Sequence, residues 1–111
     1  MGVIFANNSP IIAIGGGPIG RNAIATKSND YTLLLFDYAI LCNASSGSFS
    51  ITLPSASTCT GKTYVIKKID SSSNSVTIAG DVNIDGNLTL VIATQYDSVT
   101  VICDGENWFI I

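Results

Sequence analysis

A run of glycines near the start of the chain has the spacing of a dinucleotide-binding loop. Three glycines of IIAIGGGPIG (residues 11–20) match the GxGxxG pattern, and Asp37 lies where a ribose-binding acid is expected, roughly 20 residues further on. That chemistry also needs a helix whose N-terminus meets the pyrophosphate, but residues 21–30 show no sustained helical period. We therefore expect a glycine connection here, and nucleotide binding or a small enzymatic domain is the weaker alternative.

A second candidate site has the first half of a calcium-loop pattern. Asp81, Asn83, Asp85 and Gly86 follow the order D-x-N-x-D-G, whose oxygens at alternate positions could surround a hard cation. The closing bidentate glutamate is missing, because Ile92 occupies its position. We expect a turn at this place and no metal.

Enzymatic chemistry has little support in the sequence. The chain contains no histidine, so no histidine-based triad or histidine metal ligand exists. Asp97, Asp104 and Glu106 are the carboxylates that could pair, but they lie in turn-like sequence, where acids are normally solvated. We expect a protein that is not an enzyme and that binds no cofactor.

The composition points to association with other copies of the chain. With 111 residues the chain is long enough for one modest core. It is 47% hydrophobic and only 12% charged, which is little charge for the surface of a small monomer. No apolar run approaches the roughly 18 residues that a membrane helix requires. We therefore expect no membrane insertion and assign the apolar excess to contacts between subunits.

The charge pattern and the start of the sequence bear on two further possibilities, nucleic-acid binding and secretion. The net charge is −3 and Lys and Arg do not cluster, which argues against nucleic acid as a partner. The start, MGVIFANNSP, has no basic region before its apolar residues, so we expect no secretion signal.

The cysteine pattern favours thiols over a disulfide framework. Cys42, Cys59 and Cys103 form no CxxC pair and are odd in number, which is typical of buried thiols in a reducing compartment. One disulfide plus a free thiol remains an alternative.

Residues 62–80, KTYVIKKIDSSSNSVTIAG, carry the clearest strand pattern. Two runs with period-two alternation flank the polar residues Asp70 to Asn74. We predict that the two runs pair as an antiparallel hairpin across this short loop. Either Lys67 or Lys68 must then point into the core, and we expect its ammonium group to reach a carboxylate such as Asp70, Asp85 or Asp97, on the same chain or on a neighbouring subunit.

Similar patterns recur along the chain. The other predicted strands are Leu33–Phe36, Tyr38–Cys42, Phe49–Leu53, Leu88–Ala93, Val99–Cys103 and Trp108–Ile111. Because no helical period persists, we predict an all-β fold of closely spaced antiparallel strands. The apolar ending at Trp108–Ile111 is expected to pack into the sheet.

A set of short motifs in fixed order resembles a known viral module. The motifs are Leu53-Pro54, Gly61-Lys62, TYVIKKIDSSSNSVTI (63–78), Ile84-Asp85-Gly86, Gln95-Tyr96 and Asp104-Gly105 with Asn107-Trp108. Over residues 30–111 the chain resembles a recurring C-terminal module of tail-fibre and fibre-head proteins of bacteriophages and related viruses.

The resemblance implies a compact β-sandwich or jelly-roll-like, β-rich head domain at residues 30–111. It does not cover residues 1–29, whose short apolar stretches broken by Asn, Gly and Pro predict an N-terminal arm or shaft connection with short strands. It implies a homotrimer on the virion surface, made in the host cytoplasm, that attaches to a host-surface receptor, with carbohydrate as one candidate. The alternative is a structural capsid or fibre-assembly module without a receptor of its own. Polar loops are the expected recognition surface, and the residues predicted to bind are Ser45, Ser46, Ser72, Ser73, Asn74, Asp104, Glu106 and Asn107.

Overall fold

Nine strands and one short helical turn form the part of the chain that the structure describes. The computed structural model describes residues 22–111. The elements in order are β1 (Ala23–Lys27), β2 (Tyr31–Thr32), β3 (Asp37–Cys42), β4 (Phe49–Thr52), the 3-10 turn η1 (Ala56–Thr58), β5 (Thr63–Lys68), β6 (Val76–Ile84), β7 (Asn87–Ile92), β8 (Ser98–Cys103) and β9 (Trp108–Ile110). The predicted all-β class is confirmed.

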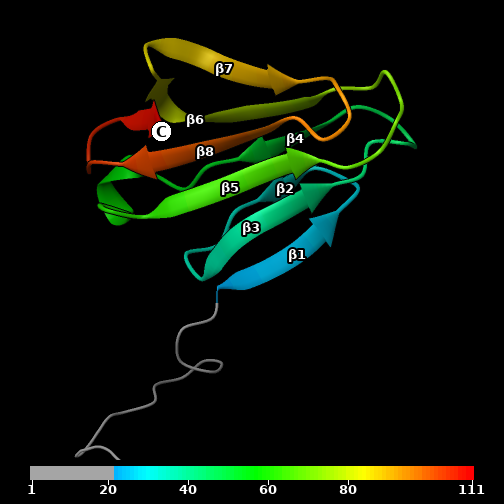
Figure 1. The fold of residues 1–111 in the computed structure, drawn as a ribbon. Helices are drawn as coiled ribbons and strands as arrows, with labels where there is room; N and C mark the ends of the chain where they lie inside the picture. The colour runs from blue at the N-terminus through cyan, green and yellow to red at the C-terminus, as the bar shows by residue number, and fades with distance from the viewer. Residues whose placement is uncertain (1–21) are drawn as a thin grey trace, which may run out of the picture.

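The first six strands wind as a coil between two stacks. Strands β1, β3 and β5 pair in parallel in one stack, and β2, β4 and β6 pair in parallel in the other. Each turn of the coil therefore adds one strand to each stack, and a strand of the opposite stack serves as the long crossover that parallel pairing requires. Figure 1 shows the first stack in front of the second.

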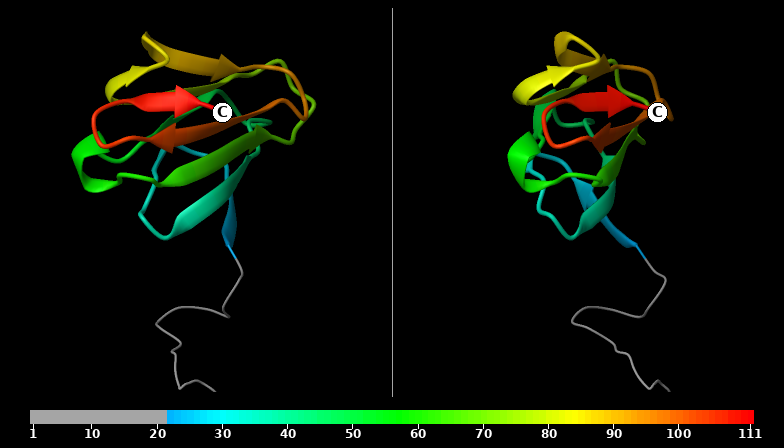
Figure 2. Two further views of the ribbon diagram at one scale, coloured as in Figure 1. Left: turned by 60° about the vertical axis from the view of Figure 1, so that its left-hand side comes forward. Right: turned by 90° about the vertical axis from the view of Figure 1, so that its left-hand side faces the viewer.

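The last strands join the two stacks into one curled sheet. Strand β8 pairs antiparallel with β5 and with β9, and β9 touches β6 at a single pair, Trp108 with Ile84. Figure 2 shows β9, in red, running beside β8. The result is a compact, sandwich-like fold that is nearly closed, with β1 and β2 at the ends of the sheet.

The alternating residues of both stacks fill one core. Ile40, Ile51, Ile66 and Ile78 come from four different strands and are all fully buried. Each large aliphatic side chain that is fully buried contributes about 1.5–3 kcal/mol of transfer free energy. Trp108 is also fully buried, which confirms the predicted packing for this residue, whereas Phe109, Ile110 and Ile111 are exposed.

The predicted hairpin at residues 62–80 is wrong. Both of its strands exist, as β5 and β6, but β5 pairs with β3 and β8, whereas β6 pairs with β4, β7 and β9. Period-two alternation specifies which side chains face the core, and it does so equally for a hairpin and for two strands in opposite stacks. The polar loop is the step from one stack to the other.

The predicted antiparallel pairing is correct only for part of the sheet. Of the eight strand pairs among residues 22–111, five are parallel and three are antiparallel. The three antiparallel pairs all involve β7 or β8, late in the chain. The sheet is therefore mixed.

The predicted strand at Leu33–Phe36 is a turn. Leu33 is buried, whereas the three residues that follow it are exposed. The buried carboxylate of Asp37 holds the turn, because its Oδ2 accepts hydrogen bonds from the Leu34 N–H at 2.9 Å and from the Tyr31 hydroxyl at 2.7 Å. The hydrogen bond from the Tyr31 hydroxyl to Asp37 raises the pKa of Tyr31. Asp37 thus has a structural role that sequence spacing did not indicate.

The sheet begins before the predicted start of the head. Strand β1 lies within the segment assigned to the N-terminal arm, and it pairs with β3, which lies in the head segment. The division into an arm and a head stays a prediction, but the β-structure extends back at least to Ala23. The GxGxxG pattern at residues 11–20 lies outside the described residues.

Candidate functional site

The connections between strands gather at the two ends of the stacks. Residues 28–30, 43–48, 69–75 and 93–97 lie at one end, which we call the serine-rich end, at the right of Figure 1. The structure therefore brings Ser45 and Ser46 together with Ser72, Ser73 and Asn74, as a shared recognition surface requires.

The other three predicted residues lie at the opposite end. Asp104, Glu106 and Asn107 form the turn between β8 and β9, and the Oδ1 atom of Asp104 accepts the N–H groups of the other two residues at 2.8 Å each. The backbone N–H groups of Asn107 and Glu106 lower the pKa of Asp104. Asp104 stabilises its own turn, and these residues do not share a surface with the predicted serines.

Hydrogen bonds fix the loops of the serine-rich end to one another. The Ala44 carbonyl accepts the Asn74 amide at 2.8 Å and the Ser72 hydroxyl at 3.2 Å. The Ser48 hydroxyl accepts the Ser75 N–H at 2.8 Å. Ser72 and Asn74 are thus occupied within the chain, whereas Ser45, Ser46 and Ser73 are exposed.

A buried cation lies beneath these loops. The Lys68 side chain is 0% exposed, and its Nζ donates to the carboxylate and the carbonyl of Asp70 at 3.0 Å each and to the Ser72 carbonyl at 2.7 Å. This confirms that one lysine reaches a carboxylate, and the carboxylate is on the same chain. The other lysine, Lys67, points outward and donates to the Tyr96 carbonyl at 2.8 Å.

Asp70 is the acceptor that organises this end. Desolvation acts to raise its pKa, but hydrogen bonds from the Ser72 hydroxyl, the Ala44 N–H and Lys68 outweigh desolvation and hold the pKa well below its ordinary value of 3.8. The ionised carboxylate thereby ties the 43–48 loop to the 69–75 loop.

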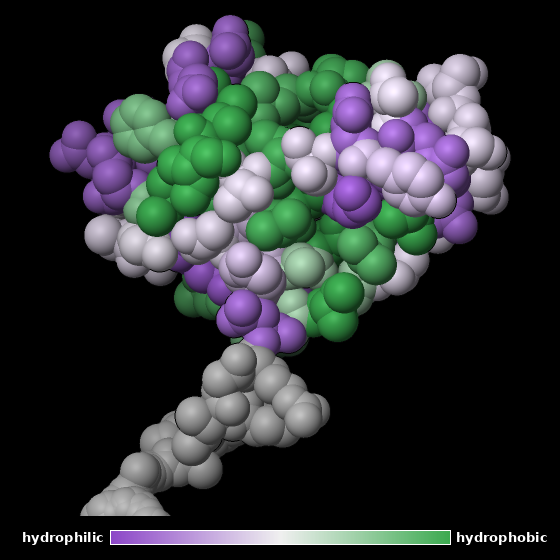
Figure 3. Space-filling view, viewed as in Figure 1, coloured by the Kyte–Doolittle hydropathy of each residue, from purple (hydrophilic) through white to green (hydrophobic). Residues whose placement is uncertain are grey.

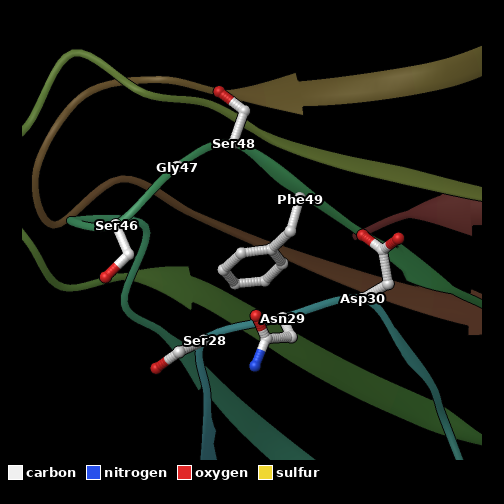
Figure 4. Close-up of a pocket in the computed structure, with 7 residues that line it drawn as sticks. All are labelled: Ser28, Asn29, Asp30, Ser46, Gly47, Ser48 and Phe49. Carbon is white, nitrogen blue, oxygen red and sulfur yellow. The ribbon is translucent and has the colours of Figure 1, made fainter.

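A polar groove opens between two of the loops. Its volume is about 380 Å³, and it is lined by Ser28, Asn29, Asp30, Ser46, Gly47, Ser48 and Phe49. Figure 4 shows the ring of Phe49 lying between the segment 28–30 and the loop 46–48. Sequence reasoning missed Ser28 and Asn29 as site residues, because they fell in the segment assigned to the arm. The polar run Ser28-Asn29-Asp30 before Tyr31 was the signal that could have found them.

The groove is lined by polar side chains that can bind a polar molecule. Asp30 uses one carboxylate oxygen to accept the Ser50 N–H at 2.8 Å. Within residues 22–111, no side-chain hydrogen bond engages Ser28, Asn29 or Ser46, so their polar groups can reach a ligand. The hydroxyl, amide and carboxylate groups that line the groove are suited to an uncharged ligand with several hydroxyl groups.

The residues of the partial calcium-loop pattern at 81–86 take part in hydrogen bonds within the chain. Asp81 accepts the Ser55 hydroxyl at 2.9 Å, and Asp85 accepts the Ile110 N–H at 3.1 Å from a turn in which its own φ is 49°. The amide of Asn83 donates to the Gly86 carbonyl at 3.4 Å. Among residues 22–111, no group of three metal-ligating side chains comes together.

An apolar cleft separates β7 from β8 and β9. It has a volume of about 200 Å³ and is lined by Leu90, Val91, Ile92, Asp97, Ser98, Val99 and Ile110. The cleft exists because β7 pairs with β6 alone. Figure 3 shows hydrophobic side chains gathered on the face that carries β7, β8 and the C-terminus.

The described residues contain no helix of the length and apolarity that a membrane crossing requires. No protein-family model and no curated protein sequence matches this chain.

Proposed function

We propose that this chain is the head domain of a viral fibre, which forms a trimer and attaches to a host-surface receptor through its serine-rich end. The observation that carries the proposal is the polar groove between residues 28–30 and 46–49, held on hydrogen-bonded loops of a rigid sheet. The ordered motifs that resemble fibre-head modules support the same role. In this role the protein is made in the host cytoplasm and displayed on the virion surface.

The receptor class that suits the groove is a neutral glycan. Sugar hydroxyls can pair with Asn29, Asp30 and Ser46, which line the groove. The net charge of −3 and the carboxylate of Asp30 disfavour acidic sugars.

A glycan array probed with the labelled full chain tests this proposal. We expect binding to neutral glycans, and we expect Asn29→Ala and Ser46→Ala each to weaken binding roughly tenfold, because each variant removes hydrogen bonds to the ligand. Ser57→Ala is the matched control, since Ser57 is an exposed serine at the opposite end. Binding that neither groove variant alters would contradict the proposed site, and absence of binding to any glycan would contradict a glycan receptor.

The apolar cleft favours a second candidate function, a fibre or capsid assembly module without its own receptor. Five of its seven lining residues are apolar, which suits contact with another subunit better than contact with a soluble ligand. The two functions differ in one measurable respect. An assembly module forms the trimer and leaves adsorption to host cells unchanged when Ser46 and Ser73 are replaced.

The weaker alternative, a nucleotide-binding or small enzymatic domain, rests on residues 11–20. A thermal-shift assay with nicotinamide and flavin nucleotides tests it, and an unchanged melting temperature would remove it.

A further inference from the structure

Two of the three cysteines lie in neighbouring segments at the end opposite the serine-rich end. Cys59 follows η1 in the connection between β4 and β5, and Cys103 is the last residue of β8. Both are buried, with exposed fractions of 4% and 1%. Their segments are far apart in sequence, so their proximity is produced by the fold.

The two thiols share one acceptor. The carbonyl oxygen of Ala56 lies 3.2 Å from the Sγ of Cys103 and 3.8 Å from the Sγ of Cys59. Cys59 also reaches the Ser55 carbonyl at 3.2 Å. Because both sulfur atoms are directed at the same carbonyl group, they occupy one small region of the core.

The backbone holds the two residues together on both sides. The Gly61 N–H donates to the Cys103 carbonyl at 2.7 Å, and the Cys103 N–H donates to the Lys62 carbonyl at 3.1 Å. The Lys62 N–H closes a turn back to the Cys59 carbonyl at 2.9 Å. The turn that carries Cys59 is therefore hydrogen-bonded directly to Cys103.

Gly105 adds a second contact between the same segments. Its N–H donates to the Cys103 Sγ at 3.3 Å, and a Cβ at this position would lie 2.7 Å from the Oγ1 of Thr60. This close approach favours glycine at position 105. It places the β8–β9 turn in contact with Thr60, the residue that follows Cys59.

Cys42 provides the contrast. It ends β3 and so lies toward the serine-rich end, because β3 runs parallel to β5 and β5 runs antiparallel to β8. Its strand neighbour is Lys68, and its thiol points to the Ile40 carbonyl at 4.0 Å. It has no cysteine partner at its own end of the fold.

We propose that Cys59 and Cys103 form an intramolecular disulfide when the folded protein meets oxidised glutathione, and that Cys42 stays a thiol. One protein thiolate attacks a glutathione sulfur atom, which forms a mixed disulfide and releases one glutathione. The second protein thiolate attacks the protein sulfur of that intermediate and releases the second glutathione. Two protein thiols are oxidised, one oxidised glutathione is reduced to two thiols, and the protein's two protons pass to the glutathione thiolates.

Burial, together with the neighbouring Cys103, raises the pKa of Cys59 to about 11, so little thiolate exists at neutral pH. The fraction of Cys59 present as thiolate rises with pH, and we therefore expect the bond to form faster at pH 9 than at pH 7. Once formed, it fixes the β4–β5 connection to the end of β8. This inference does not depend on the proposed function.

The experiment incubates the purified full chain with oxidised glutathione, alkylates the remaining thiols and maps the peptides without reduction. Chymotrypsin is the suitable protease, because cuts after Phe49 and Tyr64 separate Cys59 from Cys42 and from Cys103. We expect a Cys59–Cys103 cross-link, an alkylated Cys42, and a melting temperature raised by roughly 10 °C that a reductant reverses.

Three variants complete the test. Cys42→Ala is the matched control and should form the bond as the natural chain does, whereas Cys59→Ala and Cys103→Ala should abolish the oxidative rise in melting temperature. Circular dichroism checks that each variant folds. Three results would overturn the proposal: a cross-link that involves Cys42, a disulfide only between chains, or three alkylated cysteines after prolonged incubation at pH 9. Each of them can be read from the peptide map of the natural chain, without any variant.

Discussion

At the scale of the residue, the costliest feature of the described chain is the buried ammonium group of Lys68. A buried charge is tolerated only where it is paired and hydrogen-bonded, and Lys68 meets this condition with one carboxylate oxygen and two carbonyl groups. The two acceptor residues, Asp70 and Ser72, also hold the loop next to Ala44. The same few atoms therefore neutralise the core charge and shape the serine-rich end.

Asp70 makes the stability of the fold depend on pH in the acid range. Its pKa is lowered by folding, so the unfolded chain takes up a proton first as the pH falls. The stabilisation is complete above the ordinary pKa of 3.8 and is lost as the pH falls below that value toward the folded-state pKa. Asp70→Asn should be less stable than the natural chain at pH 7, and this difference should shrink toward pH 2. Between pH 2 and pH 4, the slope of unfolding free energy against pH for Asp70→Asn should correspond to about one proton fewer taken up on unfolding than for the natural chain.

Urea unfolding followed between pH 2 and pH 7 measures this effect. Ser73→Ala is the matched control, because Ser73 is an exposed residue of the same loop, and it should keep the acid limb of the natural chain. Parallel stability curves for Asp70→Asn and the natural chain would show that Asp70 is not the group responsible.

At the scale of the element, the sequence indicates which side chains share a face of a strand, but it does not indicate which strands pair with each other. Alternation places Tyr64 and Ile66 on one face of β5 and Val76 and Ile78 on one face of β6, and these are the faces that the structure buries. It cannot tell whether β5 pairs with β6, since a strand in a coil and a strand in a hairpin bury the same side chains. The buried lysine could be predicted because two adjacent lysines on one strand must face opposite sides. The polar run at 28–30 is visible in the sequence, but its position opposite Ser46 is not, because that position depends on the parallel pairing of β1 with β3.

The last element, β9, gives a test of how the two stacks are joined. Its Trp108 is fully buried and is the only residue of β9 that pairs with β6. Deleting residues 108–111 removes this side chain and the contact between stacks, so we expect loss of cooperative unfolding, because removing one buried Trp side chain costs about 3–5 kcal/mol. Deleting Ile111 alone should lower the melting temperature only slightly, since its side chain is 68% exposed. Thermal unfolding followed by circular dichroism distinguishes the two deletions, and a cooperative transition in the longer deletion would show that β9 is dispensable.

At the scale of the whole molecule, the two ends and the side of the sheet have different chemistry. The serine-rich end presents polar side chains on loops that are tied together, whereas the side formed by β7 and β9 presents an apolar cleft. A fibre head needs such a division, because the surface that meets the receptor must stay free when the subunits associate.

The proposed trimer can be tested at the cleft. Val91 and Ile110 line it with exposed fractions of 60% and 39%, and a lysine at either position would place a charge where a neighbouring subunit packs. In sedimentation at micromolar concentration we expect a trimer for the natural chain and a shift toward monomer for Val91→Lys and Ile110→Lys. Ile24→Lys is the matched control, because Ile24 is as exposed as Val91, at 67%, but lies on β1 at the edge of the sheet. A monomeric natural chain would contradict the trimer, whereas a trimer that both cleft variants leave intact would place the subunit contact on another face.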